Sequence, residues 1–179
     1  MILEIKEKGN DRFYREVINV SSQYRHLLKK PRRKIKDLFR EYKVLLILSA
    51  IVLLLNILCL CFFGAGPTEY CVTAFLLLVT VFLAMVIFRL NKLKKTMQTD
   101  PRTSTLTLNE DGVALNKENT QEVRFGWDNV VFIRILREGI YFIAAEQTGM
   151  LISVSRRYEN EILPWVKENR PALELVSEE

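Results

Sequence analysis

Two long uncharged apolar runs constrain the fold of this chain more than any other feature. Residues 44–63 and 71–88 contain no charged side chain, and most positions in both are Leu, Ile, Val or Phe. A helix rises about 1.5 Å per residue, so each run covers roughly the 30 Å hydrocarbon layer of a bilayer. The glycines and Pro67 in residues 64–70 are expected to stop a helix. The pattern predicts a membrane-spanning α-helical hairpin over residues 44–90, with its turn at residues 64–70.

A signal peptide and a buried soluble hairpin both fit these runs less well. A cleaved signal peptide has a shorter apolar core at the extreme N-terminus, whereas more than forty residues precede residue 44. A buried hairpin of a soluble protein would need covering on all sides, and the remaining chain is too small for that.

The charge distribution predicts an orientation. The net charge is +5, and the basic residues gather before residue 44 and after residue 88, while the intervening turn carries only Glu69. Positive flanks stay in the cytoplasm, so both termini are expected on the cytoplasmic side of a multi-pass protein. Because these flanks account for the excess charge, nucleic acid is not an expected partner.

Polar residues recur inside the apolar runs at helix-face spacing. In lipid, such residues allow close helix approach and hydrogen bonds between helices. An alternative for Asn56 is a place in an ion path, although one amide is too little to line a channel. The three cysteines are interpreted as apolar packing residues, with no disulfide framework and no metal site. The candidate interhelical packing residues are Ser49, Asn56, Thr73 and Thr80.

Residues 1–43 are expected to form a cytoplasmic segment. Residues 12–20 fit either an amphipathic helix or a strand. Helical spacing continues to Tyr42, but Pro31 should break it, which predicts a basic juxtamembrane helix from about Arg32 to Lys43. This helix suits an anionic membrane surface, or its charges only set the orientation. Whether residues 1–24 join the C-terminal sheet is left open.

After a basic linker at residues 91–102, residues 103–179 are predicted to form a β-domain. Short alternating runs separated by turns predict strands at 103–108, 112–116, 122–126, 130–136, 140–144 and 150–154, followed by a helix at 158–169. This order predicts an α+β domain: a strongly bent antiparallel sheet with a C-terminal helix and no parallel crossover.

The order of these pieces resembles that of the bacterial YcxB-like family. The resemblance rests on a basic segment, two spans, and the stretches TLTLNEDGVAL, VRFGWDNVVFI, GIYFIA and LISVSRR. Ser153-Val-Ser-Arg-Arg157 departs from the family, which commonly has a proline in this stretch. The resemblance implies a C-terminal domain similar to a bacterial pleckstrin-homology fold, at the bacterial plasma (inner) membrane. It implies no activity.

No catalytic signature is present in the sequence. The seven glycines form no phosphate-binding loop, and the single histidine, His26, has no metal or nucleophile partner pattern. Asp128 is a better Asx-turn residue than a catalytic base. We therefore expect no enzyme, no cofactor and no metal, and a membrane-anchored interaction or regulatory module with an unidentified protein partner.

Two further hypotheses stay open. In the first, the chain senses anionic lipid headgroups at the cytoplasmic face of the bilayer. In the second, hairpins form a homo-oligomer that makes a permeation or lytic device. The candidate membrane-surface or headgroup contacts are Arg32, Arg33, Lys34, Lys92, Lys94, Lys95, Arg156 and Arg157.

Overall fold

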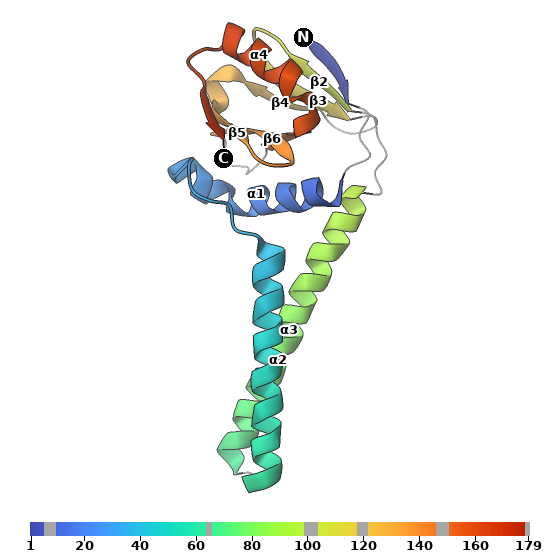
Figure 1. Cartoon of the computed structure of the whole chain (residues 1–179), viewed down its shortest axis with the longest axis vertical. Coiled ribbons are helices and arrows are strands. Elements are labelled where there is room, and N and C mark those ends of the chain that lie inside the picture. The colour runs from blue at the N-terminus through green and yellow to red at the C-terminus, as the bar shows by residue number, and fades with distance from the viewer. Residues whose placement is uncertain (6–9, 64–65, 99–103, 118–121, 146–150, 178–179) are drawn as a thin grey trace. The chain divides into compact units, whose positions relative to one another are not determined.

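The structure, a computed structural model, describes residues 1–5, 10–63, 66–98, 104–117, 122–145 and 151–177. It separates into two compact units (Figure 1). One unit, here called the β-domain, combines residues 1–35 with residues 97–179. The other, the hairpin, comprises residues 36–96. The hairpin is therefore an insertion between two segments of a single folded domain.

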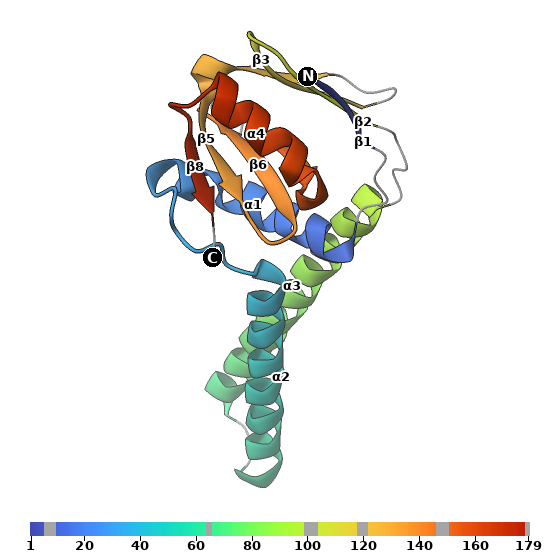
Figure 2. The same ribbon diagram turned by 45° about the horizontal axis from the view of Figure 1, so that its top comes forward.

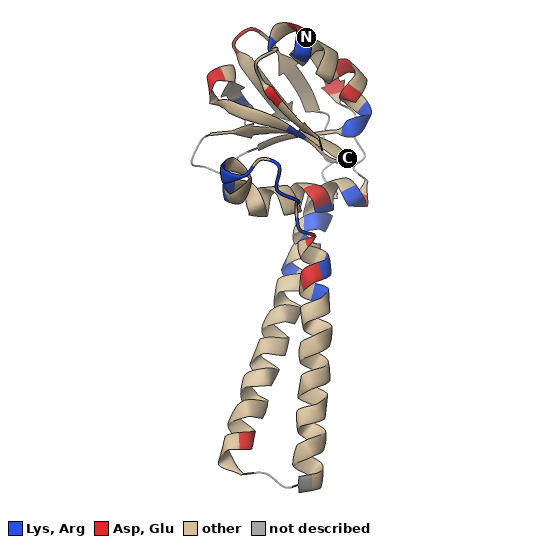
Figure 3. Ribbon diagram, turned by 60° about the vertical axis from the view of Figure 1, so that its left-hand side comes forward, with Lys and Arg blue, Asp and Glu red and all other residues tan. Residues whose placement is uncertain are grey.

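Both apolar runs form long helices, as predicted. These are α2 (Leu38–Phe63) and α3 (Pro67–Gln98), and both are long and apolar enough to cross a membrane. In Figure 3 the ribbon of the two helices carries the colours of charged residues only near the helix ends. Asp37 begins α2, because its carboxylate accepts hydrogen bonds from the backbone N–H groups of Phe39 (3.1 Å) and Arg40 (3.4 Å).

Two predicted boundaries of the second helix were wrong. Pro67 does not stop a helix but opens α3, where its fixed φ and missing N–H carry no cost. Residues 67–70 are therefore helical rather than part of the turn, and residues 64–65 lie outside the described residues. Residues 91–98 of the predicted linker are also helical, while residues 99–103 are not described.

The two helices pack along a seam of partly buried positions. The spacing between these positions alternates between three and four residues, which is the repeat of left-handed helix packing. The other positions of the charge-free runs are mostly exposed. The seam comprises Tyr42, Leu46, Ser49, Leu53, Asn56 and Leu60 of α2, and Thr73, Leu76, Thr80, Leu83, Ile87 and Leu90 of α3.

The β-domain contains two four-stranded sheets among the described residues. The first has the order β1-β2-β3-β4 and the second β7-β6-β5-β8. The domain is α+β and mostly antiparallel, as predicted. The bounds are β1 (Ile2–Ile5), β2 (Ser104–Leu108), β3 (Gly112–Lys117), β4 (Val123–Gly126), β5 (Val130–Ile135), β6 (Gly139–Ala144), β7 (Leu151–Ser155) and β8 (Glu174–Ser177).

Two expectations about the sheets were wrong. The strands pair as two separate hydrogen-bonded sheets rather than as one bent sheet. The unpredicted strand β8 pairs with β5 in parallel. Helix α4 (Glu159–Asn169) causes this, because it crosses the domain after β7 and returns the chain to β5 in the same direction. The predicted turns at residues 118–119 and 147–149 lie outside the described residues.

The N-terminal segment joins the sheet, which settles the question left open by the sequence. Strand β1 pairs antiparallel with β2, with Leu3 opposite Leu106. The N-terminal ammonium donates to the carbonyl of Leu108 at 2.6 Å. Leu3 and Ile5 are buried in the main core.

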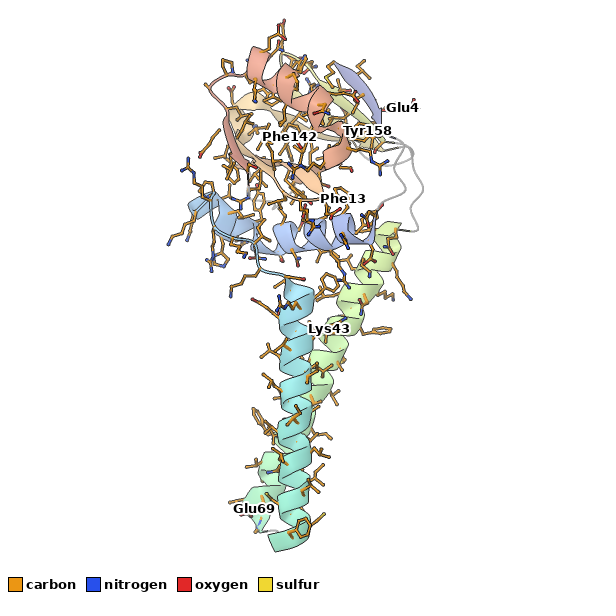
Figure 4. All side chains as sticks on the ribbon, viewed as in Figure 1. Glu4, Phe13, Lys43, Glu69, Phe142 and Tyr158 are labelled. Atoms are coloured by element: carbon orange, nitrogen blue, oxygen red, sulfur yellow. The ribbon has the colours of Figure 1, made fainter. Side chains whose placement is uncertain are left out.

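The second sheet is covered on both faces, so all of β6 is buried. Figures 1 and 2 show α4 on one face of β5 and β6 and helix α1 (Asp11–Lys29) on the other. The side chains of β6 alternate between these two faces. Ile140 and Phe142 belong to the core shared with the first sheet and α4, as Figure 4 shows for Phe142. Tyr141 and Ile143 belong to a second core, under α1.

The connection between α1 and α2 corrects the juxtamembrane prediction. Residues 12–20 are helical and belong to α1, which ends at Lys29, just before Pro31. Residues 32–37 form neither helix nor strand, so the predicted helix from Arg32 to Lys43 exists only from Leu38 onward. A buried arginine of β5 holds this non-helical segment, as described next.

Candidate functional site

The candidate site is the chain segment that follows α1, here called the basic strap (residues 30–35). It contains Lys30, Arg32, Arg33 and Lys34, and all four of these residues are exposed. The N–H of Arg33 donates to the carbonyl of Lys30 at 3.1 Å, which closes a turn around Pro31. Ile35 packs against the core under α1 and anchors the far end of the strap.

Arg134 of β5 fixes the backbone of the strap from inside the β-domain. Its side chain is only 1% exposed. Its guanidinium donates to the carbonyl of Pro31, and to that of Arg33 at 3.2 Å. Such charge-assisted bonds are among the stronger hydrogen bonds in proteins. Because these carbonyls point inward to Arg134, the side chain of Arg32, which lies between them in the chain, is presented to solvent.

The strap borders a surface cleft of about 690 Å³. Glu174 of β8 supplies the one acidic group of its described lining, which otherwise consists of Lys30, Pro31, Arg32 and Arg33. The Arg32 guanidinium lies 3.5 Å from the Glu174 carboxylate, but the Arg32 side chain is 86% exposed. Such an exposed pair is weak. The cleft therefore offers several cations to an anionic group, against one carboxylate.

Polar contacts hold α1, and with it the start of the strap, against the sheet. Glu16 accepts hydrogen bonds from the hydroxyl of Tyr141 (2.8 Å) and from the N–H of Glu138 (3.3 Å). Burial raises the pKa of Glu16 above its ordinary value, although these hydrogen bonds oppose the shift. The hydroxyl of Tyr24 donates to the carbonyl of Ala144.

The other candidate headgroup contacts belong to α3 of the hairpin and to the stretch that follows β7. Lys92, Lys94 and Lys95 belong to α3, where Lys92 and Lys95 are exposed and Lys94 is partly buried. Arg156 forms an ion pair with Glu159 at 2.6 Å and donates to the carbonyl of Leu136 at 3.3 Å. The Arg156 guanidinium is therefore engaged in contacts within the β-domain. Arg157, its neighbour, is exposed.

The structure brings the four candidate interhelical residues together in two pairs. The hydroxyl of Thr73 lies 2.5 Å from the amide oxygen of Asn56. The hydroxyl of Thr80 lies 3.3 Å from that of Ser49. Both pairs join α2 to α3 across the seam.

A second cleft, of about 390 Å³, lies beside the C-terminal end of α4. Trp127 stacks on Trp165 with ring centres 5.9 Å apart, and the Arg170 guanidinium lies 5.6 Å from the Trp127 ring. The Trp127 indole donates to the carbonyl of Asn109 at 2.7 Å. These mutual contacts describe a surface packing cluster, and Asp128, which also lines the cleft, is exposed.

Sequence reasoning missed the residues that build the site from inside. Arg134 lies between Ile133 and Ile135 in an apolar strand, and a charge at such a position was the available signal. Glu16 and Tyr141 gave no comparable signal, because their pairing depends on how α1 crosses β6. No group of three potential metal ligands occurs among the residues that the structure describes.

Comparison of the chain with protein-family models, with curated proteins and with solved structures finds no match.

Proposed function

We propose that this protein is a non-enzymatic interaction module whose β-domain is held at the cytoplasmic face of the bacterial plasma membrane by the hairpin. The observation that carries the proposal is the insertion of the hairpin into the β-domain. Because β1 and α1 precede the hairpin while their partners β2 and β6 follow it, both ends of the hairpin must reach the same folded domain. A two-span anchor meets this requirement, whereas a single span does not.

The side of the membrane follows from charge. Exposed basic residues are frequent before the first uncharged run and after the second, and the first turn of α3 holds the acidic Glu69. Moving the basic flanks outward would oppose the membrane potential and the attraction of the anionic inner leaflet. This supports cytoplasmic termini.

The proposed domain type is pleckstrin-homology-like, within a YcxB-like protein. Support comes from two mostly antiparallel sheets that share one core and are closed by α4. With no catalytic constellation in the sequence, a domain of this kind supplies surfaces for a protein partner. Its described edge strands and the clefts at the strap and at Trp127 are the available surfaces.

A topology experiment tests the anchoring. In a variant lacking Cys59, Cys61 and Cys71, a cysteine at Thr68 should react with an impermeant thiol reagent in intact cells. A cysteine at Ser177 should react only after the membrane is opened. Labelling of Ser177→Cys but not of Thr68→Cys in intact cells would refute the proposed orientation. Crosslinking in native membranes that recovers no protein would argue against the interaction role.

A second candidate function, sensing of anionic lipid headgroups, is favoured by the basic strap. Only nine residues separate Lys34 from Val44, where the uncharged run begins. Chain length alone therefore keeps Lys34 within about 25 Å of that boundary. Each Lys or Arg near an anionic leaflet contributes about 1 kcal/mol of attraction to the membrane surface.

Native mass spectrometry of the full chain tests this second function, with anionic and zwitterionic lipids offered together. Neutralising Arg32, Arg33 and Lys34 to Gln should reduce the number of anionic lipids that the protein retains. Neutralising the exposed Arg124, Arg137 and Lys167 removes the same net charge and is the matched control. An equal loss in both variants would show that net charge, and not the strap, attracts the lipid.

A further inference from the structure

Asn56 is the most polar side chain of the first apolar run and lies deep within it. It lies twelve positions after Val44 and seven positions before Phe63, which places it about 18 Å and about 10 Å from the two ends of the run. Under the proposed membrane placement this is hydrocarbon. An amide group left without hydrogen bonds there costs several kcal/mol.

The hydroxyl groups near Asn56 differ from it in one respect, because each can use an acceptor within its own helix. Ser49 donates to the carbonyl of Leu46 at 3.0 Å, Thr73 to that of Glu69 at 2.8 Å, and Thr80 to that of Leu76 at 2.8 Å. These groups are therefore satisfied in an isolated hairpin.

The amide of Asn56 is only partly satisfied. A primary amide carries two N–H donors and a carbonyl with two acceptor positions. Within the described residues its one partner is the hydroxyl of Thr73, at 2.5 Å. The hydroxyl hydrogen of Thr73 can serve either Asn56 or Glu69, and rotating the amide by 180° lets its NH₂ group donate to Thr73 instead. In either orientation at least one N–H group and one acceptor position of the carbonyl oxygen form no hydrogen bond within the described residues.

The leftover groups lie at a part of the hairpin that is open to lipid. Asn56 is partly exposed at the edge of the seam. On its outer side it is flanked, one turn away in each direction, by Val52, which is 49% exposed, and by the exposed Cys59. Both flanking side chains are shorter than the Leu and Ile side chains that make up most of this run, which permits a second helix to approach more closely here.

We propose that the Asn56 amide pairs with the Asn56 amide of a second copy of this chain, across a twofold axis between two α2 helices. A primary amide is self-complementary, because two of them exchange two N–H···O=C bonds when related by such an axis. A symmetric contact of this kind uses the same patch on both copies. These two bonds use the remaining N–H group and the carbonyl oxygen of each amide. An apolar lipid chain offers no hydrogen-bond partner to either group.

The test uses the full-length protein in detergent and in native membranes. Sedimentation equilibrium should show a monomer–dimer equilibrium, and Asn56→Leu should weaken dimerisation about tenfold or more, because two intramembrane hydrogen bonds are lost. Asn56→Gln keeps the amide and should keep the dimer. Thr73→Val is the matched control, because it removes the partner within the hairpin but leaves the amide, and it should not weaken the dimer.

A second readout reports the geometry of the contact. With Cys61 and Cys71 replaced by Ser, Cys59 lies one turn from Asn56 and should form an oxidative crosslink between two copies in membranes. Asn56→Leu should strongly reduce the yield of this crosslink. The fluorescence of Trp127 and Trp165 and the thermal unfolding of the β-domain should be the same in all variants, which verifies folding.

Three results would overturn the proposal: a wild-type protein that is monomeric at all concentrations, an Asn56→Leu protein that dimerises equally well, or a Thr73→Val protein weakened as strongly as Asn56→Leu. The last result would mean that the amide acts only within the hairpin. Alkaline extraction of the membranes separates this failure from that of the proposed anchoring. A protein released by alkali is not membrane-spanning, whereas a monomer retained in the membrane refutes the dimer alone.

Discussion

Deleting residues 1–35 should prevent the β-domain from folding, although among the described strands only β1 precedes the hairpin. The segment supplies β1 to the first sheet and α1 to the outer face of the second. Without it, β2 loses its partner, and the face of β5 and β6 that carries Phe132 and Tyr141 is exposed to water.

The magnitude follows from the side chains that the segment buries in the two cores. Fully burying a large apolar side chain contributes about 1.5–3 kcal/mol, so five of them contribute roughly 8–15 kcal/mol, an upper estimate. A whole domain is typically stable by only about 5–15 kcal/mol. The five side chains are Leu3, Ile5, Val20, Tyr24 and Leu27.

Two polypeptides compare the presence and absence of the segment. One comprises residues 97–179 alone. The other joins residues 1–35 to residues 97–179 through a long flexible Gly/Ser linker that replaces the hairpin. The joined chain should unfold cooperatively in urea, followed by Trp127 and Trp165 fluorescence, and should show dispersed amide NMR signals. The shorter chain should show neither property. A shorter chain that unfolds cooperatively with the midpoint of the joined one would refute the reasoning.

Three further substitutions in the full-length protein test individual contacts. Arg134→Met should lower the free energy of unfolding of the β-domain in urea by about 2–5 kcal/mol, because two hydrogen bonds from a charged donor are lost. The control is Arg137→Met at an exposed position, which should change this free energy by less than about 0.5 kcal/mol. Gly112→Ala should lower the thermal unfolding midpoint, because an added Cβ would collide with the backbone carbonyl oxygen of Phe125, with a cost of about 1–3 kcal/mol. Burial raises the pKa of Glu16 above 4.5, so the folded state binds this proton more tightly and stability falls as pH rises from 4.5 through the raised pKa. Glu16→Gln should lack this fall, as unfolding midpoints measured across the same pH range would show; an unchanged pH dependence would contradict the assignment.

The hairpin was predictable because its signal is local. Length and hydropathy alone identify both helices, and the helical spacing of Ser49, Asn56, Thr73 and Thr80 indicated a shared seam. The errors at Pro67 and at residues 91–98 concern boundaries. Proline stops a helix at an interior position but opens one at its first position, and the sequence does not distinguish these cases without the path of the chain.

The candidate site was predictable only at its surface. Lys30 to Lys34 are visible as a basic run, but the prediction made most of them helical. Their actual backbone depends on Arg134, about a hundred positions later in the chain, which reaches them only once β5 is paired and α1 is docked. The pairing of Glu16 with Tyr141 likewise depends on the packing of α1.

Local physical chemistry in the sequence thus determined the two apolar helices, most strands of the β-domain and its C-terminal helix, since periodicity and turn residues act over a few neighbouring positions. Only the tertiary structure decided that β1 and α1 belong to the same domain as the strands after the hairpin, that β8 runs parallel to β5, and that the strap is not helical. The physical reason is common to all three. Each depends on burying apolar surface or satisfying a buried donor across a long sequence separation, and the short-range patterns of a single chain carry no information about which distant segments meet.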